Sequence, residues 1–318
     1  MTLKIGVLLG GVSAEREISL LTGEAIYQAL LQKGYNCVKI DPDQQVAAKI
    51  AAENLDLAFL ALHGKHGEDG NLQGLLEIMG VPYTGSGVLA SAISMDKLAT
   101  KKMLGYDGLP TPKHITVDIG KITEDPQGIA AGIIAELGLP LIVKPPRQGS
   151  SIGVSIVRTA EQLPDALDTA CRYDPTTVMA EEYIAGQEIN AAVLGNKRPL
   201  ALPLIEILSA TEFYDYEAKY SPGMSDHLIP PRLDEKLQET IKDLAVRTFK
   251  SLGCRGLARV DFLIDPQGNS YILELNSIPG MTATSLCPEA AKACGIGFAD
   301  LTELMVKLAL DENFEVTL

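Results

Sequence analysis

The sequence predicts an α/β protein whose first domain is a doubly wound parallel sheet. An apolar run at 3–9 ends in two glycines and is followed by an amphipathic stretch at 13–33. Two further apolar runs, at 35–40 and 57–62, have the length of buried strands. A strand, a glycine turn and a helix followed by more strands begin a doubly wound domain. The GxGxxG fingerprint is absent, so the pattern does not indicate a dinucleotide-binding Rossmann domain.

Composition restricts the class of protein and its partners. The chain has 318 residues, of which 46% are hydrophobic and 21% charged, as expected for a soluble globular protein of about two or three domains. A net charge of −14 argues against a nucleic-acid partner, so an anionic substrate must be attracted by local cations. The five cysteines form no CxxC pair, which favours reduced thiols. No signal-peptide pattern and no apolar run of ~20 residues occurs, so we expect a cytoplasmic protein without a membrane partner.

The first helix and the third strand each deliver polar residues to one edge of the sheet. Glu15 falls at the helix N-terminus, where the helix dipole favours an anion, although a first-turn acid is also common without any function. The third strand leads into a loop at 63–74 with four glycines, placed where ligands bind in such folds. A metal site from His63 and His66 is a weak hypothesis, because a lone HxxH on a loop is usually polar surface. A short strand at 81–84 closes the domain.

A helical pattern at 88–104 follows and carries Lys97, either a solvated helix lysine or a phosphate ligand. Strands at 141–144 and 153–157 then flank a glycine-serine loop at 147–152. Backbone N–H groups and hydroxyls of such a loop can bind a phosphate, with Lys144 as a point charge. No Walker A sequence is present, and the loop alone is weak evidence for phosphate binding.

Two later segments have the composition of a nucleotide site. Glu181, Glu182 and Glu188 are expected on a strand, a turn and the next strand. They can accept hydrogen bonds from an adenine amino group and ribose hydroxyls, or form a solvated acidic turn. The stretch at 211–227 is polar and aromatic without a clear period, typical of a lid or a disordered segment, and its three tyrosines and Lys219 favour the lid.

The segment at 256–280 predicts a β-hairpin, because alternating runs at 258–264 and 270–275 flank Asp-Pro-Gln-Gly-Asn. Hard oxygen ligands suited to Mg²⁺ with phosphate converge across this pair. They are Asp261, Glu274 and Asn276. Arg259 lies two residues before the first of them, on the same face. Acids that merely face water are the alternative, but apolar neighbours disfavour it because an unpaired buried charge is costly.

Taken in order, five motifs resemble the D-alanine–D-alanine ligase family of the ATP-grasp superfamily over nearly the whole chain. The motifs are GGxSxEREISLxTG at 10–23, HGxxGEDGxxQG at 63–74, VKPxxxGSSxG at 143–153, YDYEAKY at 214–220, and RVDF with ELNSIPGMTxTSL within 259–286. The resemblance implies a three-domain ATP-grasp fold, with ATP between the second and third domains and substrate between the first and third. The expected domains are an N-terminal substrate domain at 1–87, a central domain at 88–185, and a C-terminal domain at 186–318 with the lid loop at 211–227.

The resemblance also implies a reaction. The carboxylate of one D-alanine attacks the γ-phosphate of ATP, and the amine of a second D-alanine displaces phosphate from the acyl phosphate to form the dipeptide, a peptidoglycan precursor. Two Mg²⁺ ions, or Mn²⁺ in their place, are the implied metal cofactors, and a homodimer is the implied assembly. Partners are the small molecules ATP and D-alanine.

The matched motifs carry residue roles for the nucleotide. The implied Mg²⁺ ligands are Asp261, Glu274 and Asn276. The implied phosphate ligands are Lys97, Lys144 and Ser151, and the implied adenine and ribose contacts are Glu181 and Glu188.

They also carry roles for the amino acids. The implied first D-alanine site comprises Glu15, Ser150 and Tyr220, with His63 beside it. Arg259 and the backbone N–H of Gly280 are the implied oxyanion donors, and Lys219 and Ser285 the implied ligands of the second carboxylate.

Departures from the family pattern are small, and two other functions are the alternatives. Gln148 stands where an acid is common, and no Trp is present to cover the nucleotide. Tyr220 predicts D-alanine rather than D-lactate as the second substrate. An altered YEAKY lid or a lost Ser285 would favour another ATP-grasp carboxylate-amine ligase, and neither is seen. Loss of the hairpin residues would favour a nucleotide-binding protein without catalysis, but all of them are present.

Overall fold

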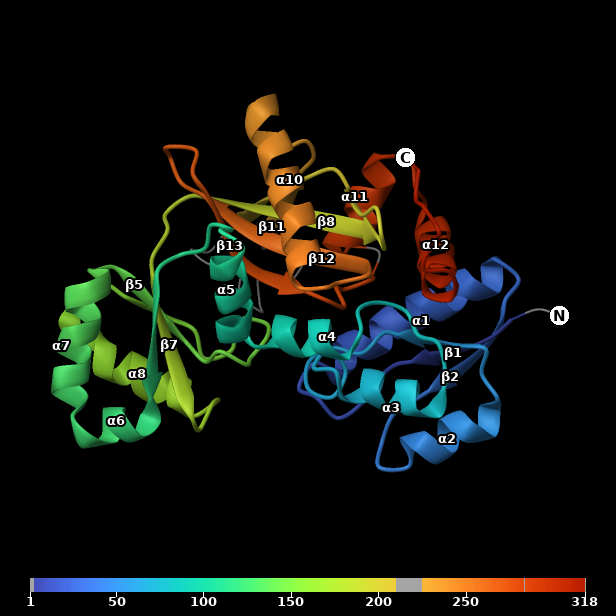
Figure 1. Cartoon of the computed structure of the whole chain (residues 1–318), viewed down its shortest axis with the longest axis horizontal. Helices are drawn as coiled ribbons and strands as arrows, with labels where there is room; N and C mark the ends of the chain where they lie inside the picture. Colours follow the sequence, from blue (N-terminus) through green and yellow to red (C-terminus); the bar gives the residue numbers. More distant parts are fainter. Residues whose placement is uncertain (1–2, 210–224, 283, 318) are drawn as a thin grey trace.

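The computed structural model describes residues 3–209, 225–282 and 284–317, which form three sheets and their covering helices (Figure 1). The first sheet is parallel with the order β2-β1-β3, which confirms the doubly wound opening. Its strands are β1 (Lys4–Leu8), β2 (Asn36–Ile40) and β3 (Leu57–Leu60), and its helices are α1 (Arg16–Gln32), α2 (Val46–Glu53) and α3 (Asn71–Met79). Helix α1 packs closely on the sheet because Gly23 has no side chain: a Cβ there would lie 2.3 Å from Cβ of Leu9.

The second sheet is antiparallel with the order β4-β7-β5-β6. Three helices and this sheet enclose one apolar cluster, while residues of β5 and β7 also line a cleft. The strands are β4 (His114–Asp118), β5 (Leu141–Lys144), β6 (Ser155–Val157) and β7 (Thr177–Glu182). The helices are α6 (Ile119–Glu124), α7 (Pro126–Leu137) and α8 (Leu163–Cys171).

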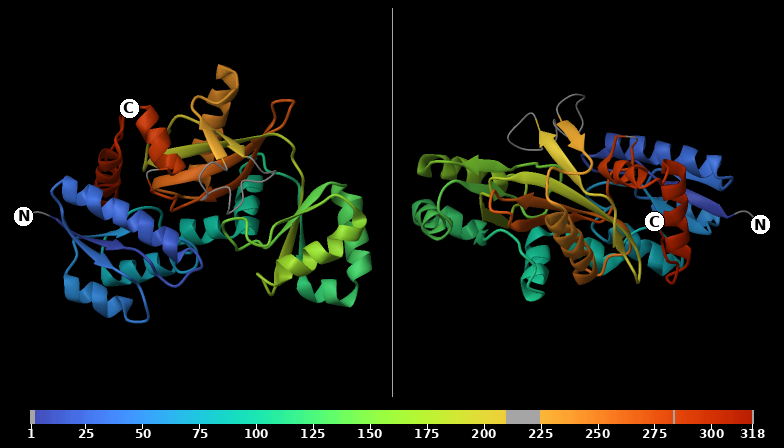
Figure 2. Two further views of the ribbon diagram at one scale, coloured as in Figure 1. Left: turned by 180° about the vertical axis from the view of Figure 1, so that it is seen from behind. Right: turned by 90° about the horizontal axis from the view of Figure 1, so that it is seen from above.

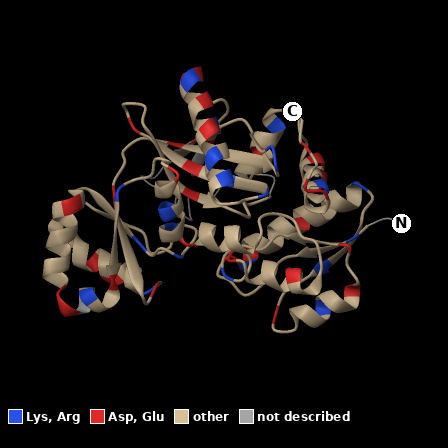
Figure 3. Cartoon of the chain, in the orientation of Figure 1, with Lys and Arg blue, Asp and Glu red and all other residues tan. Residues whose placement is uncertain are grey.

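The third sheet is antiparallel with the order β11-β10-β8-β12-β13, and β9 pairs with β8. Its strands are β8 (Gln187–Gly195), β9 (Leu200–Ala201), β10 (Ile205–Ser209), β11 (Ser225–Leu228), β12 (Gly256–Ile264) and β13 (Ser270–Asn276). Side chains of β8 alternate between two cores, as the pleat requires. Ala191 and Val193 lie in the cluster that contains α10 (Glu235–Ser251), whereas Ala192 and Leu194 lie in the cluster that contains α11 (Leu286–Ala293) and α12 (Phe298–Leu310). Basic and acidic residues are interspersed along α10 (Figure 3), and two pairs of them form ion pairs within the helix.

The prediction of one continuous helix at 88–104 is wrong. The segment is divided into α4 (Val88–Met95) and α5 (Lys97–Tyr106) by Asp96, which has extended backbone angles of φ −98° and ψ 103°. The Asp96 carboxylate accepts hydrogen bonds from the backbone N–H groups two and three residues on, so it caps α5. The break makes Lys97 the first residue of α5, at the edge of the cleft.

Two expected loops are shorter than predicted. The glycine-rich loop expected at 63–74 ends where α3 begins at Asn71. Residues 225–227, expected in the lid, belong to β11. The strand expected at 81–84 is reduced to a single parallel bridge between Tyr83 and Ala58.

The C-terminal helix returns to the first sheet, as Figures 1 and 2 show. Leu301 and Met305 of α12 share one apolar cluster with Val7 and Phe59 of the parallel sheet. Lys33, at the end of α1, forms ion pairs with two acids of α12. In the described part of the chain, no helix combines the length and apolarity needed to cross a bilayer.

Candidate active site

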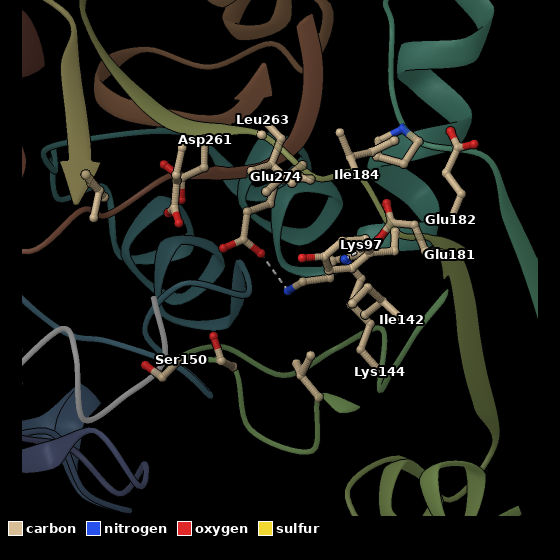
Figure 4. A pocket seen from close by; sticks show the side chains of 18 of the residues that line it. Lys97, Ile142, Lys144, Ser150, Glu181, Glu182, Ile184, Asp261, Leu263 and Glu274 are labelled. Atoms are coloured by element: carbon tan, nitrogen blue, oxygen red, sulfur yellow. Dashed lines mark ion pairs between the residues drawn. The ribbon is translucent and has the colours of Figure 1, made fainter. Parts of the chain in front are cut away.

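A cleft of about 430 Å³ separates the second sheet from the third (Figure 4). It receives side chains from β5, β7 and the glycine-serine loop on one side and from β8, β10, β12 and β13 on the other. Site residues predicted from the sequence that line it are Lys97, Lys144, Ser150, Ser151, Glu181, Glu188, Asp261 and Glu274.

Asp261 lies at the centre of the hairpin side of this cleft. The hairpin is confirmed, with Asp261 opposite Glu274 and Arg259 opposite Asn276, and a register shift follows Asp261. Arg259 binds the Asp261 carboxylate with two nitrogens, at 2.7 and 2.8 Å. Amide nitrogens of Asn190 and Asn276 donate to the same carboxylate at 2.9 and 3.0 Å. Burial lowers the pKa of Arg259, but Asp261 outweighs this effect and the pKa is raised, so the guanidinium stays charged.

The hairpin side offers donors of the kind that Mg²⁺ binds. Asp261 and Glu274 are carboxylates, and Asn276 uses its amide nitrogen toward Asp261, so its oxygen is the atom that would bind a metal. Glu274 also pairs with Lys97 at 2.9 Å, and Lys97 donates to the carbonyl of Gln148 at 2.8 Å. Within residues 3–209, 225–282 and 284–317, no group of three or more His, Cys, Asp or Glu forms a metal site. The third donor of the hairpin set is thus an amide.

Glu181, on β7, holds two lysines on the opposite side of the cleft. One carboxylate oxygen pairs with Lys144, and the other pairs with Lys101 at 2.5 Å. Burial raises the pKa of Glu181, but the two lysines outweigh it and the pKa is lowered, so the carboxylate is ionised. Sequence reasoning missed Lys101; its spacing of four residues from Lys97, on one helix face, was the available signal.

The glycine-serine loop has an unusual backbone. Ser150 and Ser151 adopt left-handed conformations with φ of 50° and 58°, which are uncommon for residues other than glycine. Arg147 anchors the start of the loop through two bonds of 2.8 Å to Asp174. The Ser150 hydroxyl donates to the Glu15 carboxylate, which joins this loop to the N-terminus of α1. The loop therefore connects the cleft with the first domain.

His63 and His66 have different surroundings. The His63 side chain is only 7% exposed and lies between the Thr22 hydroxyl, at 3.2 Å from Nε2, and Glu68, at 3.7 Å from Nδ1. His66 is 54% exposed and lies against Asn71. The structure thus gives no support for a metal site shared by the two histidines. The loop that carries His63 approaches Glu15, since a Cβ at Gly64 would lie 2.8 Å from the Glu15 carboxylate.

The turn after β13 brings Gly280 to Ser285. A Cβ at Gly280 would lie 3.0 Å from the Ser285 hydroxyl, which accepts a hydrogen bond from the backbone N–H of Thr282 at 3.0 Å. Cys287 follows on α11; burial raises its pKa to about 12, so it stays a neutral thiol. The remaining predicted residues, Lys219 and Tyr220, lie outside the described residues.

Glu206 is a second cleft residue that sequence reasoning missed. It is 1% exposed, and Arg232 binds both of its oxygens, at 2.6 Å for the shortest contact. Gln187 donates to it at 3.0 Å. Burial raises the pKa of Glu206, but Arg232 outweighs it and the pKa is lowered. No motif identified this pair, because Glu206 and Arg232 belong to different segments.

Comparisons with known proteins show the family of the chain. Family models described as D-ala D-ala ligase N-terminus and C-terminus match residues 39–86 and 103–307. A D-alanine–D-alanine ligase of Pelotomaculum thermopropionicum is 59% identical over 312 residues, covering 98% of each chain, and one of Carboxydothermus hydrogenoformans is 54% identical over 97% of this chain and 99% of its own.

Solved structures are similar along the same length. The D-alanine–D-alanine ligase of Bacillus anthracis complexed with ATP has a TM-score of 0.81 at 34% identity, over 97% of this chain and 98% of that chain. The VanG D-Ala:D-Ser ligase of Enterococcus faecalis has a TM-score of 0.83 at 30% identity, over 97% of this chain and 100% of that chain. The ATP-grasp fold expected from the sequence is confirmed. The chain therefore belongs to the D-alanine–D-alanine ligase family.

Proposed function

We propose that the cleft and the adjoining loop act together as the active site of an ATP-dependent ligase that joins two D-alanine molecules for peptidoglycan synthesis. The ligase activity follows from the family. The observation that carries the assignment to this site is the bond from Ser150 to Glu15, because it connects a phosphate-type loop with a carboxylate at the start of α1 that can bind an ammonium group.

The nucleotide half of the site would bind ATP by charge. Lys97 and Lys144 line the cleft beside the left-handed Ser150-Ser151 turn, which presents backbone N–H groups and hydroxyls to phosphate. Glu188 lines the same cleft and suits the nucleoside. Asp261, Glu274 and Asn276 would hold Mg²⁺, which neutralises phosphate charge when bound.

The amino-acid half would run the two chemical steps. A carboxylate oxygen of the first D-alanine attacks the γ-phosphorus and ADP leaves; the amine of the second attacks the acyl carbon, a proton leaves the nitrogen, and phosphate departs. Glu15 would bind the first ammonium group, with Ser150, His63 and Tyr220 around it. Arg259 and the N–H of Gly280 would stabilise the oxyanion of the tetrahedral intermediate, and Ser285 with Lys219 would bind the second carboxylate.

Three further assignments complete the proposal. We propose the domain boundaries at 87 and 185 that the sequence predicts, although α4 and α5 pack in the core of the third sheet. A homodimer and a cytoplasmic location are proposed from the family. Sedimentation velocity tests the dimer, and a single monomeric species at micromolar concentration would contradict it.

The identity of the second substrate needs its own test, because the similar structures include a D-Ala:D-Ser ligase. Phosphate release with ATP and Mg²⁺ is measured with D-alanine, L-alanine, and D-alanine plus D-serine or D-lactate, and products are identified by mass. We expect the D-alanyl-D-alanine dipeptide as the main product in every mixture that contains D-alanine. A main product containing D-serine would contradict the assignment.

Tyr220 tests discrimination against D-lactate. Tyr220→Phe should raise the share of ester product, because the hydroxyl of this residue is expected to disfavour the oxygen nucleophile. Tyr216→Phe, in the same segment, is the matched control. An unchanged product ratio in Tyr220→Phe would contradict the role of Tyr220.

A further inference from the structure

Lys101 is a buried cation behind the cleft to which no role has been assigned. It is 2% exposed, on α5. Its ammonium donates to the Thr111 hydroxyl at 2.6 Å and to the Pro112 carbonyl at 3.1 Å, and pairs with Glu181 at 2.5 Å. The Thr111 hydroxyl in turn donates to the Ile272 carbonyl of β13 at 2.8 Å. The ammonium thus has two hydrogen-bond acceptors and one ion-pair partner, and Thr111 links it to the third sheet.

Glu181 is shared between this buried cation and one that faces the cleft. It is also 2% exposed, and its second oxygen pairs with Lys144. Figure 4 shows Glu181 and Lys144 together at the cavity. Two ammonium groups and one carboxylate leave a net charge of +1. Without Lys101, Glu181 and Lys144 would form a neutral pair, and the phosphate-binding side of the cleft would lose one positive charge.

We infer that Lys101 is a positioning residue of the nucleotide site: it neutralises Glu181, so that Lys144 keeps its positive charge for the phosphates of ATP. The inference rests on the proposed nucleotide site and deepens it. It also gives Glu181 an electrostatic role, since both of its oxygens are committed to lysines.

The surroundings of Lys101 make this charge sensitive to pH. Burial lowers the pKa of Lys101 to about 8; Glu181 opposes the shift, Lys144 adds to it, and Glu182 opposes it weakly. His114 of β4 also faces the cluster, and its pKa is lowered, first by burial and then by Lys101, so it adds no charge at neutral pH. The cluster therefore carries +1 at pH 7 and loses this charge above about pH 8.

Charge-counting variants test the inference by calorimetric titration with Mg·ATP, inorganic tripolyphosphate and adenosine. Lys101→Met gives a cluster charge of 0, and Lys101→Met with Glu181→Gln restores +1. We expect Lys101→Met to weaken ATP and tripolyphosphate by about tenfold or more, equivalent to about 1.4 kcal/mol, and the double variant to recover to within about threefold of wild type. Adenosine, which has no phosphate, should bind Lys101→Met as tightly as it binds the wild type.

Several outcomes would overturn the inference. Unchanged tripolyphosphate affinity in folded Lys101→Met would do so, as would a double variant as weak as the single one, or an equal loss for adenosine, which would indicate general disruption of the site. Lys144→Met separates this failure from that of the proposed site: unchanged ATP affinity in Lys144→Met would instead refute the site itself.

The wild-type protein provides a second measurement if the variants do not fold. Its ATP affinity should fall by about tenfold between pH 7 and pH 9, a range in which the terminal phosphate of ATP is already ionised. A flat profile over this range would overturn the inference.

Discussion

Replacing Arg259 by methionine tests whether its proposed role in transition-state stabilisation is separate from nucleotide binding. The change removes both bonds to Asp261 but leaves the amide donors of Asn190 and Asn276, so the buried carboxylate retains two of its four hydrogen bonds. Breaking a buried ion pair costs about 3–5 kcal/mol of unfolding free energy, and the retained donors place the expected loss near the lower value, about 3 kcal/mol. Loss of an oxyanion donor should lower kcat by about 10²–10³.

The assay measures phosphate and dipeptide release together with ATP affinity by calorimetry. ATP affinity should stay within about threefold of wild type, because the donor acts on the tetrahedral intermediate. Arg255→Met is the matched control: Arg255 stacks on Tyr83 at 4.9 Å and donates to the Gly85 carbonyl, so its loss should reduce stability and spare kcat. Glu274→Gln should instead weaken nucleotide binding through Mg²⁺. The role of Arg259 would be refuted if kcat of Arg259→Met fell by less than tenfold, or if its ATP affinity fell by the same factor as kcat.

Three further predictions concern stability. Arg232→Met should lower the midpoint of urea unfolding, because it leaves the buried Glu206 carboxylate without its cation, and adding Glu206→Gln should recover part of the loss. Equal midpoints of the single and double variants would contradict this. Gly256→Ala should lower the free energy of unfolding more than Gly253→Ala. The two glycines have similar φ values of 74° and 69°, but only a Cβ at Gly256 would meet backbone, 3.1 Å from Cα of Gly85. Equal urea midpoints would refute the steric argument. Burial raises the pKa of Asp174, but Arg147 and Thr176 outweigh this effect and lower the pKa below its usual 3.8. The stabilising contribution of Asp174 is therefore present above about pH 4 and is lost as the pH falls through the lower pKa of the folded state. The melting temperature should fall less between pH 6 and pH 2 in Arg147→Gln than in the wild type.

The hairpin was predictable because its signals are local. The alternating runs and the five-residue turn determine which residues pair, and Asp261 and Glu274 lie opposite each other as expected. The helix break at Asp96 was not predictable in this way, since the surrounding sequence is compatible with a continuous helix. A distant contact favours the break: the backbone N–H of Lys97 donates to the Pro146 carbonyl at 3.0 Å, which a continuous helix would prevent.

The lysine pair on Glu181 shows the same limit for the site. Resemblance to a family assigned Lys144 and Glu181 to the nucleotide, but nothing in the sequence indicated that Glu181 also pairs with Lys101, which lies 80 positions before it. The pairing of β5 with β7 places Ile142 opposite Glu181, and this register brings Lys144 within reach of the carboxylate. Pairing between strands about 40 residues apart is a property of the folded sheet, which a reading of local pattern does not contain.

The return of α12 to the first sheet determines when the first domain can be completed during synthesis on the ribosome. Lys33 and its partner Asp300 are 267 positions apart, and α12 supplies part of the apolar cluster over the parallel sheet. One face of the strands and helices that emerge first therefore stays uncovered until α12 leaves the exit tunnel. A nascent chain that stops before residue 298 lacks this cover, so the first domain is completed only after the second and third sheets have been translated.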